Sequence, residues 1–161
     1  MDPIVRAALV HYQFETAHPF LDGNGRLGRL LITLMLINDG VLHSCLFYPS
    51  FQFKKNRSEY YRQLTSVRER GTYEEWIEFF CNSLLESAKD SVGSLKNLVD
   101  LHNRSTATIT ENLGRTAANG QRLLGILEEH PIVDTAFIAA QLDIGRSTAS
   151  ALVKSFEELG I

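Results

Sequence analysis

Residues 18–37 read HPFLDGNGRLGRLLITLMLI, and this stretch decides how the rest of the chain is interpreted. Its second half is an apolar run that is typical of a buried helix. Its first half gathers glycines, one acid and two arginines where that helix begins, at a terminus whose backbone N–H groups lack helical partners. The stretch therefore predicts an anion site at the N-terminus of a helix.

Each polar residue of this stretch also has a simpler explanation. Asp22 could be only an N-cap, His18 could be a core histidine, and Arg26 and Arg29 could form a solvated helix face. The GNGRLG segment has the spacing of a dinucleotide fingerprint, but no apolar strand precedes it and no βαβ unit follows. Taken together, a base, a metal-binding carboxylate and two guanidiniums in so short a stretch favour a phosphate site.

The remainder of the chain also reads as helix, and we expect an all-α fold. Helices are predicted at about 3–18, 23–39 and 53–70, followed by a long helix that a capping box at Thr72 and Glu75 opens and that continues past Leu101. A polar stretch at 102–120 separates two expected domains, 1–112 and 113–161.

The second of these domains has the pattern of a helix-turn-helix. A first helix is predicted at 123–129, a second is capped by Asp134 or Thr135, and a third is capped by Ser147. The short turn between the last two ends in a glycine and is flanked by apolar residues, which is typical of this motif.

Composition gives an ordinary globular protein of 161 residues, with 44% hydrophobic and 22% charged residues. The longest uncharged apolar run, 30–37, is too short to span a bilayer, and no signal peptide opens the chain. Cys45 and Cys81 lie in apolar surroundings without metal-ligand spacing. We therefore expect two buried thiols, with a disulfide as the less favoured alternative, a cytoplasmic location and no membrane partner.

Residues 18–29 match in full the signature of the Fic (filamentation induced by cAMP, Fic/DOC) family. The flanking sequences resemble the helices around that signature, namely RAALVHYQFETAHPF at 6–20 and KKNRSEYYRQLTSVRERG at 54–71. The resemblance covers about residues 3 to 110 and implies a Fic-type helical core, followed by a segment similar to the winged helix of some bacterial members. Ala17 departs from the family, which usually has a larger apolar residue there.

The resemblance implies a protein adenylyltransferase (an AMPylator), which transfers AMP from ATP to a Ser, Thr or Tyr hydroxyl of a target protein. It implies that His18 is the general base and that Asp22 holds Mg²⁺. Arg26 would grip the outer phosphates, and Arg29 would support them or pair with a regulatory carboxylate. The implied nucleotide-binding residues are Asp22, Gly23, Asn24, Gly25, Arg26, Leu27, Gly28, Arg29 and Tyr60, with Gly23, Asn24 and Gly25 forming the anion hole.

Outside residues 18–29, one further position matches the family and one family motif has no counterpart. Tyr60 matches a position that lies against the nucleotide, yet it could equally be a core residue. The inhibitory motif Ser/Thr-x-x-x-Glu-Gly/Asn has no match, since the nearest stretch, TSVRER at 65–70, ends in Arg70.

The family's catalytic unit begins before the position that corresponds to residue 3, and a winged helix continues past the position that corresponds to residue 161. We therefore expect a fragment shortened at both ends, weak or inactive alone and prone to form oligomers.

Two alternatives to adenylyl transfer stay open from the sequence. Some relatives transfer phosphate or phosphocholine instead of AMP. A regulator that binds DNA or protein through residues 121–161 is the second alternative. That segment has three cationic and six acidic side chains, a net charge of −3, which opposes the phosphate neutralisation that DNA binding needs. This charge favours a protein contact or dimerisation over DNA.

Overall fold

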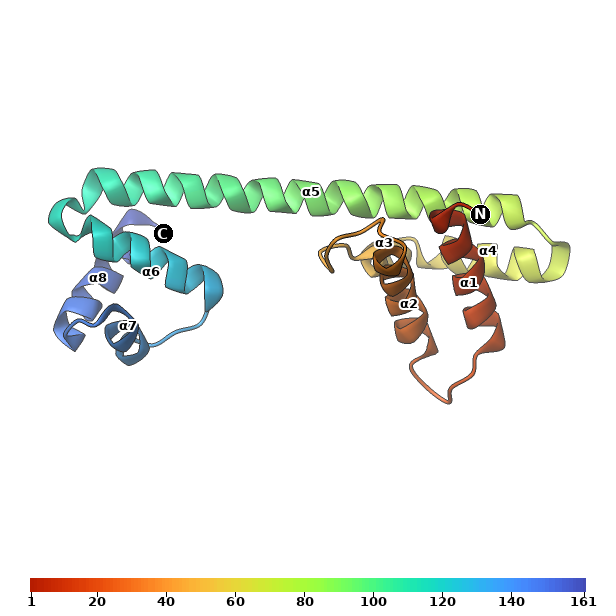
Figure 1. Ribbon diagram of the computed structural model, residues 1–161, viewed down its shortest axis with the longest axis horizontal. Helices are drawn as coiled ribbons and strands as arrows, with labels where there is room; N and C mark the ends of the chain where they lie inside the picture. Colours follow the sequence, from red (N-terminus) through yellow and green to blue (C-terminus); the bar gives the residue numbers. More distant parts are fainter. The chain divides into compact units, whose positions relative to one another are not determined.

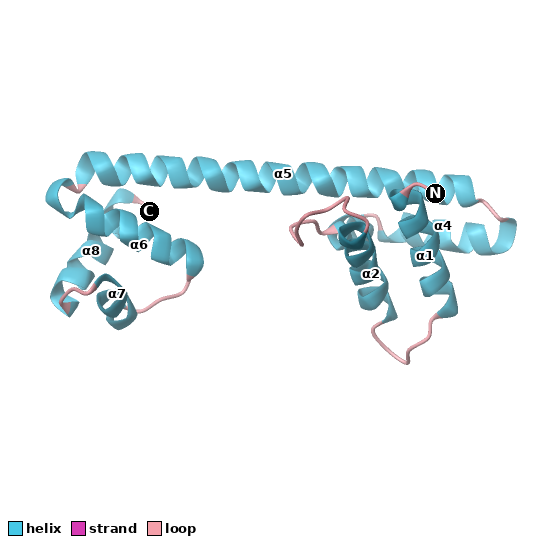
Figure 2. Ribbon diagram, in the orientation of Figure 1, coloured by secondary structure: helices cyan, strands magenta, loops and turns pink.

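The computed structural model describes all residues from 1 to 161, and every regular element in it is helical (Figure 2). The all-α expectation is confirmed. None of the helices combines the length and apolar composition that crossing a membrane requires. The elements, labelled in Figure 1, are α1 (Pro3–Ala17), α2 (Asn24–Asn38), α3 (Pro49–Lys55), α4 (Arg57–Arg70), α5 (Tyr73–Asn112), the 3₁₀ turn η1 (Gly114–Thr116), α6 (Ala117–Glu129), α7 (Thr135–Leu142) and α8 (Arg146–Leu159).

The chain forms two compact units, Met1–Leu95 and Lys96–Ile161, each with its own hydrophobic core. The boundary predicted at 112 coincides with the end of α5, whereas the contacts divide the chain within that helix. The reason is Ile109, which is fully buried in the core of the second unit, so the last turns of α5 pack there.

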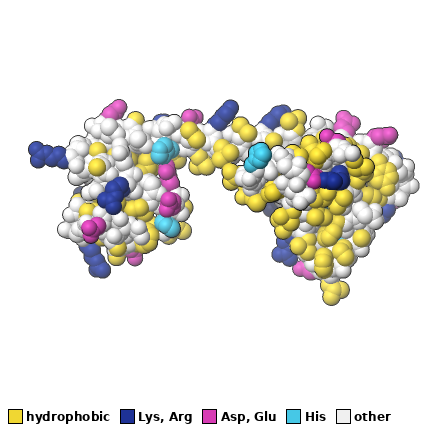
Figure 3. Space-filling view, in the orientation of Figure 1, with side chains coloured by type: hydrophobic (Ala, Val, Ile, Leu, Met, Phe, Trp, Pro, Cys, Tyr) yellow, Lys and Arg dark blue, Asp and Glu magenta, His cyan; other side chains and the backbone are white.

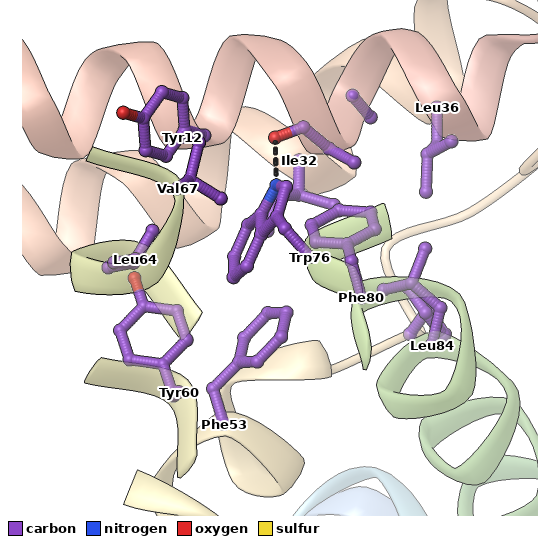
Figure 4. Packing of buried hydrophobic residues seen from close by; sticks show 13 residues of the cluster. Tyr12, Ile32, Leu36, Phe53, Tyr60, Leu64, Val67, Trp76, Phe80 and Leu84 are labelled. Carbon is purple, nitrogen blue, oxygen red and sulfur yellow. Dashed lines mark hydrogen bonds between the residues drawn. The ribbon is translucent and has the colours of Figure 1, made fainter. Parts of the chain in front are cut away.

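The core of the first unit is built around Trp76 and Phe80 of α5, both 0% exposed. The indole Nε1–H of Trp76 donates to the Ala8 carbonyl of α1 at 3.0 Å, which satisfies the only polar atom of this ring in an apolar interior (Figure 4). Phe53 and Tyr60 approach the same cluster from α3 and α4. The core thereby fixes α1 against the helices that follow the motif.

Helix α1 packs closely on α2 at Gly28. A Cβ atom built there would lie 2.5 Å from Glu15 Oε1, 3.1 Å from the Phe14 ring and 3.2 Å from His11 Cε1. The Gly28 carbonyl accepts a hydrogen bond from His11 Nδ1 at 2.9 Å. The third glycine of the motif is therefore needed for helix packing, which positions the loop between α1 and α2.

The prediction of a single helix at 53–70 is wrong, because the structure has two helices that meet at Asn56. Pro49 starts α3 earlier than predicted, as proline favours a first helical position. Asn56 then leaves the helical conformation, with φ −103° and ψ 37°. This break lets Phe53 and Tyr60, on different helices, enter one core with ring centroids 5.3 Å apart.

Helix α5 continues past Leu101 to Asn112, as the sequence predicts. The hydrogen bonding at its start differs from the predicted capping box. The Thr72 hydroxyl is bonded to Ser66 Oγ at 2.7 Å, and Ser66 also accepts from Arg70 at 2.7 Å. Thr72 therefore ties the end of α4 to the start of α5.

The second unit contains the predicted helix-turn-helix in α7 and α8. Asp134 caps α7, as expected, by accepting from the Phe137 N–H at 2.7 Å. Two details of the prediction are wrong: α6 begins at Ala117 instead of 123, and Gly145 instead of Ser147 is the N-cap of α8. Arg122 of α6 donates to the Leu142 and Gln141 carbonyls at 3.1 and 3.3 Å, so this cation stabilises the end of α7.

The prediction of two buried thiols is also wrong. Cys45 is exposed and Cys81 is only half-buried. Cys45 lies in the connection between α2 and α3, outside any regular element.

In Figure 3, hydrophobic side chains occupy much of the visible face of the first unit. The exposed apolar residues of that unit include Leu27, Leu30, Leu34, Leu46, Tyr48 and Phe51.

Candidate functional site at the start of α2

His18 ends α1 and lies at the surface of the α1–α2 loop. Its backbone is in the left-handed region, with φ 45° and ψ 55°, and its N–H donates to the Phe14 carbonyl at 3.0 Å. Pro19 follows and cannot continue the helix. A non-glycine residue in this conformation is uncommon, and such backbone strain is concentrated at functional sites. The turn leaves the imidazole exposed to solvent.

Asn24 closes the loop that carries His18. Its side chain, in a residue only 2% exposed, accepts from the Phe20 N–H at 2.9 Å and donates to the Phe20 carbonyl at 2.5 Å. This double hydrogen bond holds the loop across four residues. The Asn24 amide therefore shapes the loop, and what it can offer an anion is its backbone N–H at the first turn of α2.

The N-terminus of α2 has no side-chain cap. Gly23 is the N-cap residue, with φ 83°, and no side chain accepts from the first N–H groups of the helix. The simpler explanation of Asp22 as an N-cap is thus wrong. Its carboxylate is almost fully exposed and lies 3.3 Å from Arg26 Nη2. The first turn of α2 therefore presents unpartnered N–H groups and the positive end of a 15-residue helix.

Arg29 lies one turn further along α2 and folds back over the start of the helix. A Cβ atom at Gly25 would be 3.1 Å from Arg29 Nη1, so the glycine leaves room for the guanidinium. Arg29 also borders a cavity of about 320 Å³ between α2, α3 and α4. Three cations and no carboxylate line this cavity; its lining residues are Arg29, Ser50, Phe53, Lys54, Arg57, Tyr60 and Tyr61.

Tyr60 is buried beneath this cavity and bonded to the core. Its hydroxyl lies 2.9 Å from His11 Nε2. Burial lowers the pKa of His11 to about 4, so the imidazole is neutral at pH 7. Because Nδ1 must donate to the Gly28 carbonyl, Nε2 is the acceptor and the Tyr60 O–H is the donor. Tyr61, the next residue, is half exposed and offers its ring to the cavity.

Two residues near the motif were not singled out from the sequence. His11 and Glu15 are four residues apart on α1 and face Gly28 of α2. Glu15 Oε1 is buried without a hydrogen-bond partner. Burial raises the pKa of this carboxyl, and the neighbouring charges of Arg29 and His18 act in the opposite direction. The helical spacing of a histidine and a glutamate next to the motif was the available signal.

The other predicted site residues lie on the same helix. Leu27 is 43% exposed, whereas Gly28 is buried against α1. The structure thus brings His18, Asp22, Arg26 and Arg29 together at one end of α2. The roles assigned to these residues stay predictions.

The carboxylate of Asp22 is compatible with Mg²⁺. No three His, Cys, Asp or Glu side chains come together as a protein cage for a metal. Mg²⁺ in phosphate sites is commonly bound by one or two carboxylates together with substrate phosphates and water. One exposed carboxylate beside unpartnered N–H groups meets that requirement.

Comparison with known proteins agrees with this site. Residues 1–36 match the model of the Fic/DOC family. The matched residues include α1, the loop and most of α2, so this end of the chain is similar to the Fic/DOC family.

The relatives are named as protein adenylyltransferases. The chain is 35% identical over 96 residues to protein adenylyltransferase fic-1 of Caenorhabditis briggsae, covering 60% of this chain and 18% of the relative. It is 34% identical over 100 residues to fic-1 of Caenorhabditis elegans, covering 62% and 18%. Protein adenylyltransferase Fic of Drosophila ananassae is 37% identical over 82 residues, or 51% and 15%. The chain thus spans less than a fifth of the length of these relatives.

Proposed function

We propose that this chain contributes the nucleotide-binding and catalytic segment of a protein adenylyltransferase. The substrates are ATP and a Ser, Thr or Tyr hydroxyl of a target protein, and the products are the AMP-modified protein and pyrophosphate. The observation that carries this proposal is the uncapped N-terminus of α2, which has Arg26 and Arg29 on its first two turns and His18 on the loop before it. The names of the relatives support the same activity.

The start of α2 is the part that binds the phosphate groups. The free N–H groups of the first turn donate to phosphate oxygens, and the absence of a Cβ at Gly25 lets Arg29 approach them. The guanidiniums of Arg26 and Arg29 add charge-assisted hydrogen bonds. Mg²⁺ held by Asp22 would neutralise part of the phosphate charge.

His18 acts on the hydroxyl of the target protein. Its exposed imidazole accepts the hydroxyl proton while the hydroxyl oxygen forms a bond to the α-phosphorus. The bond from this phosphorus to the bridging oxygen breaks at the same centre, and pyrophosphate leaves. The left-handed turn at His18 matters because it ends α1 at a residue whose imidazole is exposed to solvent.

The group transferred is tested with two labels. The chain is incubated with Mg²⁺, a mixture of acceptor proteins and ATP labelled at either the α- or the γ-phosphate. We expect protein-bound label from α-labelled ATP only, at the low level expected for this chain alone. Label from γ-labelled ATP would show phosphate transfer, and no label from either would contradict transferase activity of this chain.

A further inference from the structure

We propose that the outward face of α3 and the loop before it dock an acidic segment of the protein that is modified. This α3 face consists of Leu46, Tyr48, Phe51, Lys54 and Lys55, together with Arg57 at the start of α4. The inference rests on the proposed function, because it names a surface that holds the target protein of the transfer.

The α3 face is exposed along its whole length. Tyr48 and Phe51 are 65% and 62% exposed, and Lys55 follows Phe51 by four residues on the same side of the helix. Gln52 and Phe53 point the other way and are buried. Two large aromatic rings are thus left in solvent beside cations, a combination that is enriched in protein interfaces.

The charge of this surface is one-sided. Residues 40–58 contain Lys54, Lys55 and Arg57 and no acidic residue, although the whole chain has a net charge of −3. None of these three cations is in a salt bridge. Their positive charge is therefore available to a partner.

The acidic residues nearest in sequence or packed against α3 are already occupied. Asp39 pairs with Arg6, and Glu59 pairs with Arg62 at 2.6 Å. Asp90 of α5 accepts from Gln52 at 2.7 Å on the buried side of α3. None of these carboxylates forms a salt bridge with Lys54, Lys55 or Arg57, and the positive charge of the α3 face is complementary to an acidic partner.

A protein partner fits this surface better than a lipid surface does. Helix α3 has seven residues, which is short for an amphipathic helix that lies on a membrane. Lys54 and Arg57 line the same cavity as Arg29, so the α3 face is continuous with the site at the start of α2. A target segment bound there by its acidic and apolar side chains would lie beside the cavity that Arg29 lines.

The test measures binding without ATP, using a random copolymer of glutamate and tyrosine as the probe. The variant is Phe51→Gln with Lys55→Gln, because neither residue lines the Arg29 cavity. The matched control is Leu85→Gln with Lys89→Gln on α5, which removes one exposed leucine and one exposed lysine from the same unit. We expect the α3 variant to bind the copolymer at least about tenfold more weakly, and the control to bind like the wild type. Wild-type binding should weaken as salt rises.

Three results would overturn the docking proposal: equal binding by the α3 variant and the wild type, equal loss in the control, or tighter wild-type binding of oligo-dT or phosphatidylserine vesicles than of the copolymer. The proposed function is judged separately, by transfer of the α-phosphate label. A chain that binds the copolymer through α3 but transfers no label would retain the docking surface and lose the transferase proposal. If the chain transfers label and the α3 variant binds the copolymer as the wild type does, the transferase proposal is retained and the docking surface is lost.

Discussion

At the scale of single residues, the motif combines groups for chemistry with groups for packing. Gly23 and Gly25 leave the start of α2 open, while Gly28 serves the contact with α1. Asn24 uses its side chain to close the loop around Phe20. One short sequence thus contains both the phosphate-binding groups and the contacts that hold them in place.

Glu15 is the residue whose ionisation opposes folding. Burial raises its pKa above the ordinary value of 4.5, so the folded state holds this proton to higher pH than the unfolded state. Its contribution to stability is therefore complete below the unfolded pKa and is lost as pH rises through the folded pKa. We expect Glu15→Gln, which cannot ionise, to have a higher melting temperature than wild type near pH 7 and a smaller advantage near pH 4. Thermal unfolding at a series of pH values measures this, and an advantage that is constant with pH would contradict the ionisation argument.

At the scale of helices, the sequence predicted most elements and missed where they break. The apolar spacing of α1, α2 and α5 is regular, and the glycine that ends α2, Gly40, has a left-handed φ of 70°. The break at Asn56 could not be predicted, because it depends on Phe53 and Tyr60 meeting in the core. The motif located the site, but the burial of Tyr60 and the unpartnered Oε1 of Glu15 depend on contacts between helices distant in sequence.

Substitution by alanine should have opposite effects on stability at two helical glycines, because Gly28 packs against α1 whereas Gly93 has open space around it. Gly28→Ala places a methyl group against the Phe14 and His11 rings and should destabilise the first unit by about 1–3 kcal/mol. Gly93→Ala, in α5, meets nothing within 4 Å and should stabilise the helix by roughly 0.5–1 kcal/mol. Urea unfolding compares the two variants. A Gly28→Ala protein as stable as wild type would show that the helices can separate at little cost.

At the scale of the whole molecule, the two units belong to one chain, but no buried residue is part of both hydrophobic cores. Trp76, the only tryptophan, lies in the core of the first unit, so its fluorescence reports on that unit alone. Phe156 is 3% exposed in the core of the second unit.

Separate cores predict separate responses to a core mutation. Phe156→Ala should destabilise the second unit by about 3–5 kcal/mol because it leaves a cavity. The tryptophan fluorescence transition should stay at the wild-type urea concentration, while the circular dichroism transition moves to lower urea. A matching shift of both signals would show that the units unfold together.

The central claim, that the start of α2 binds the nucleotide while His18 acts on the target hydroxyl, is tested by His18→Ala. Nucleotide affinity and transfer of the α-phosphate label are measured on one preparation, with His43→Ala, an exposed histidine of the α2–α3 connection, as the control. We predict that His18→Ala keeps its affinity for ATP with Mg²⁺ and loses transfer by a factor of about 10²–10⁴, and that His43→Ala keeps both. An equal loss of affinity and transfer in His18→Ala would contradict the claim and make His18 a residue of structure alone.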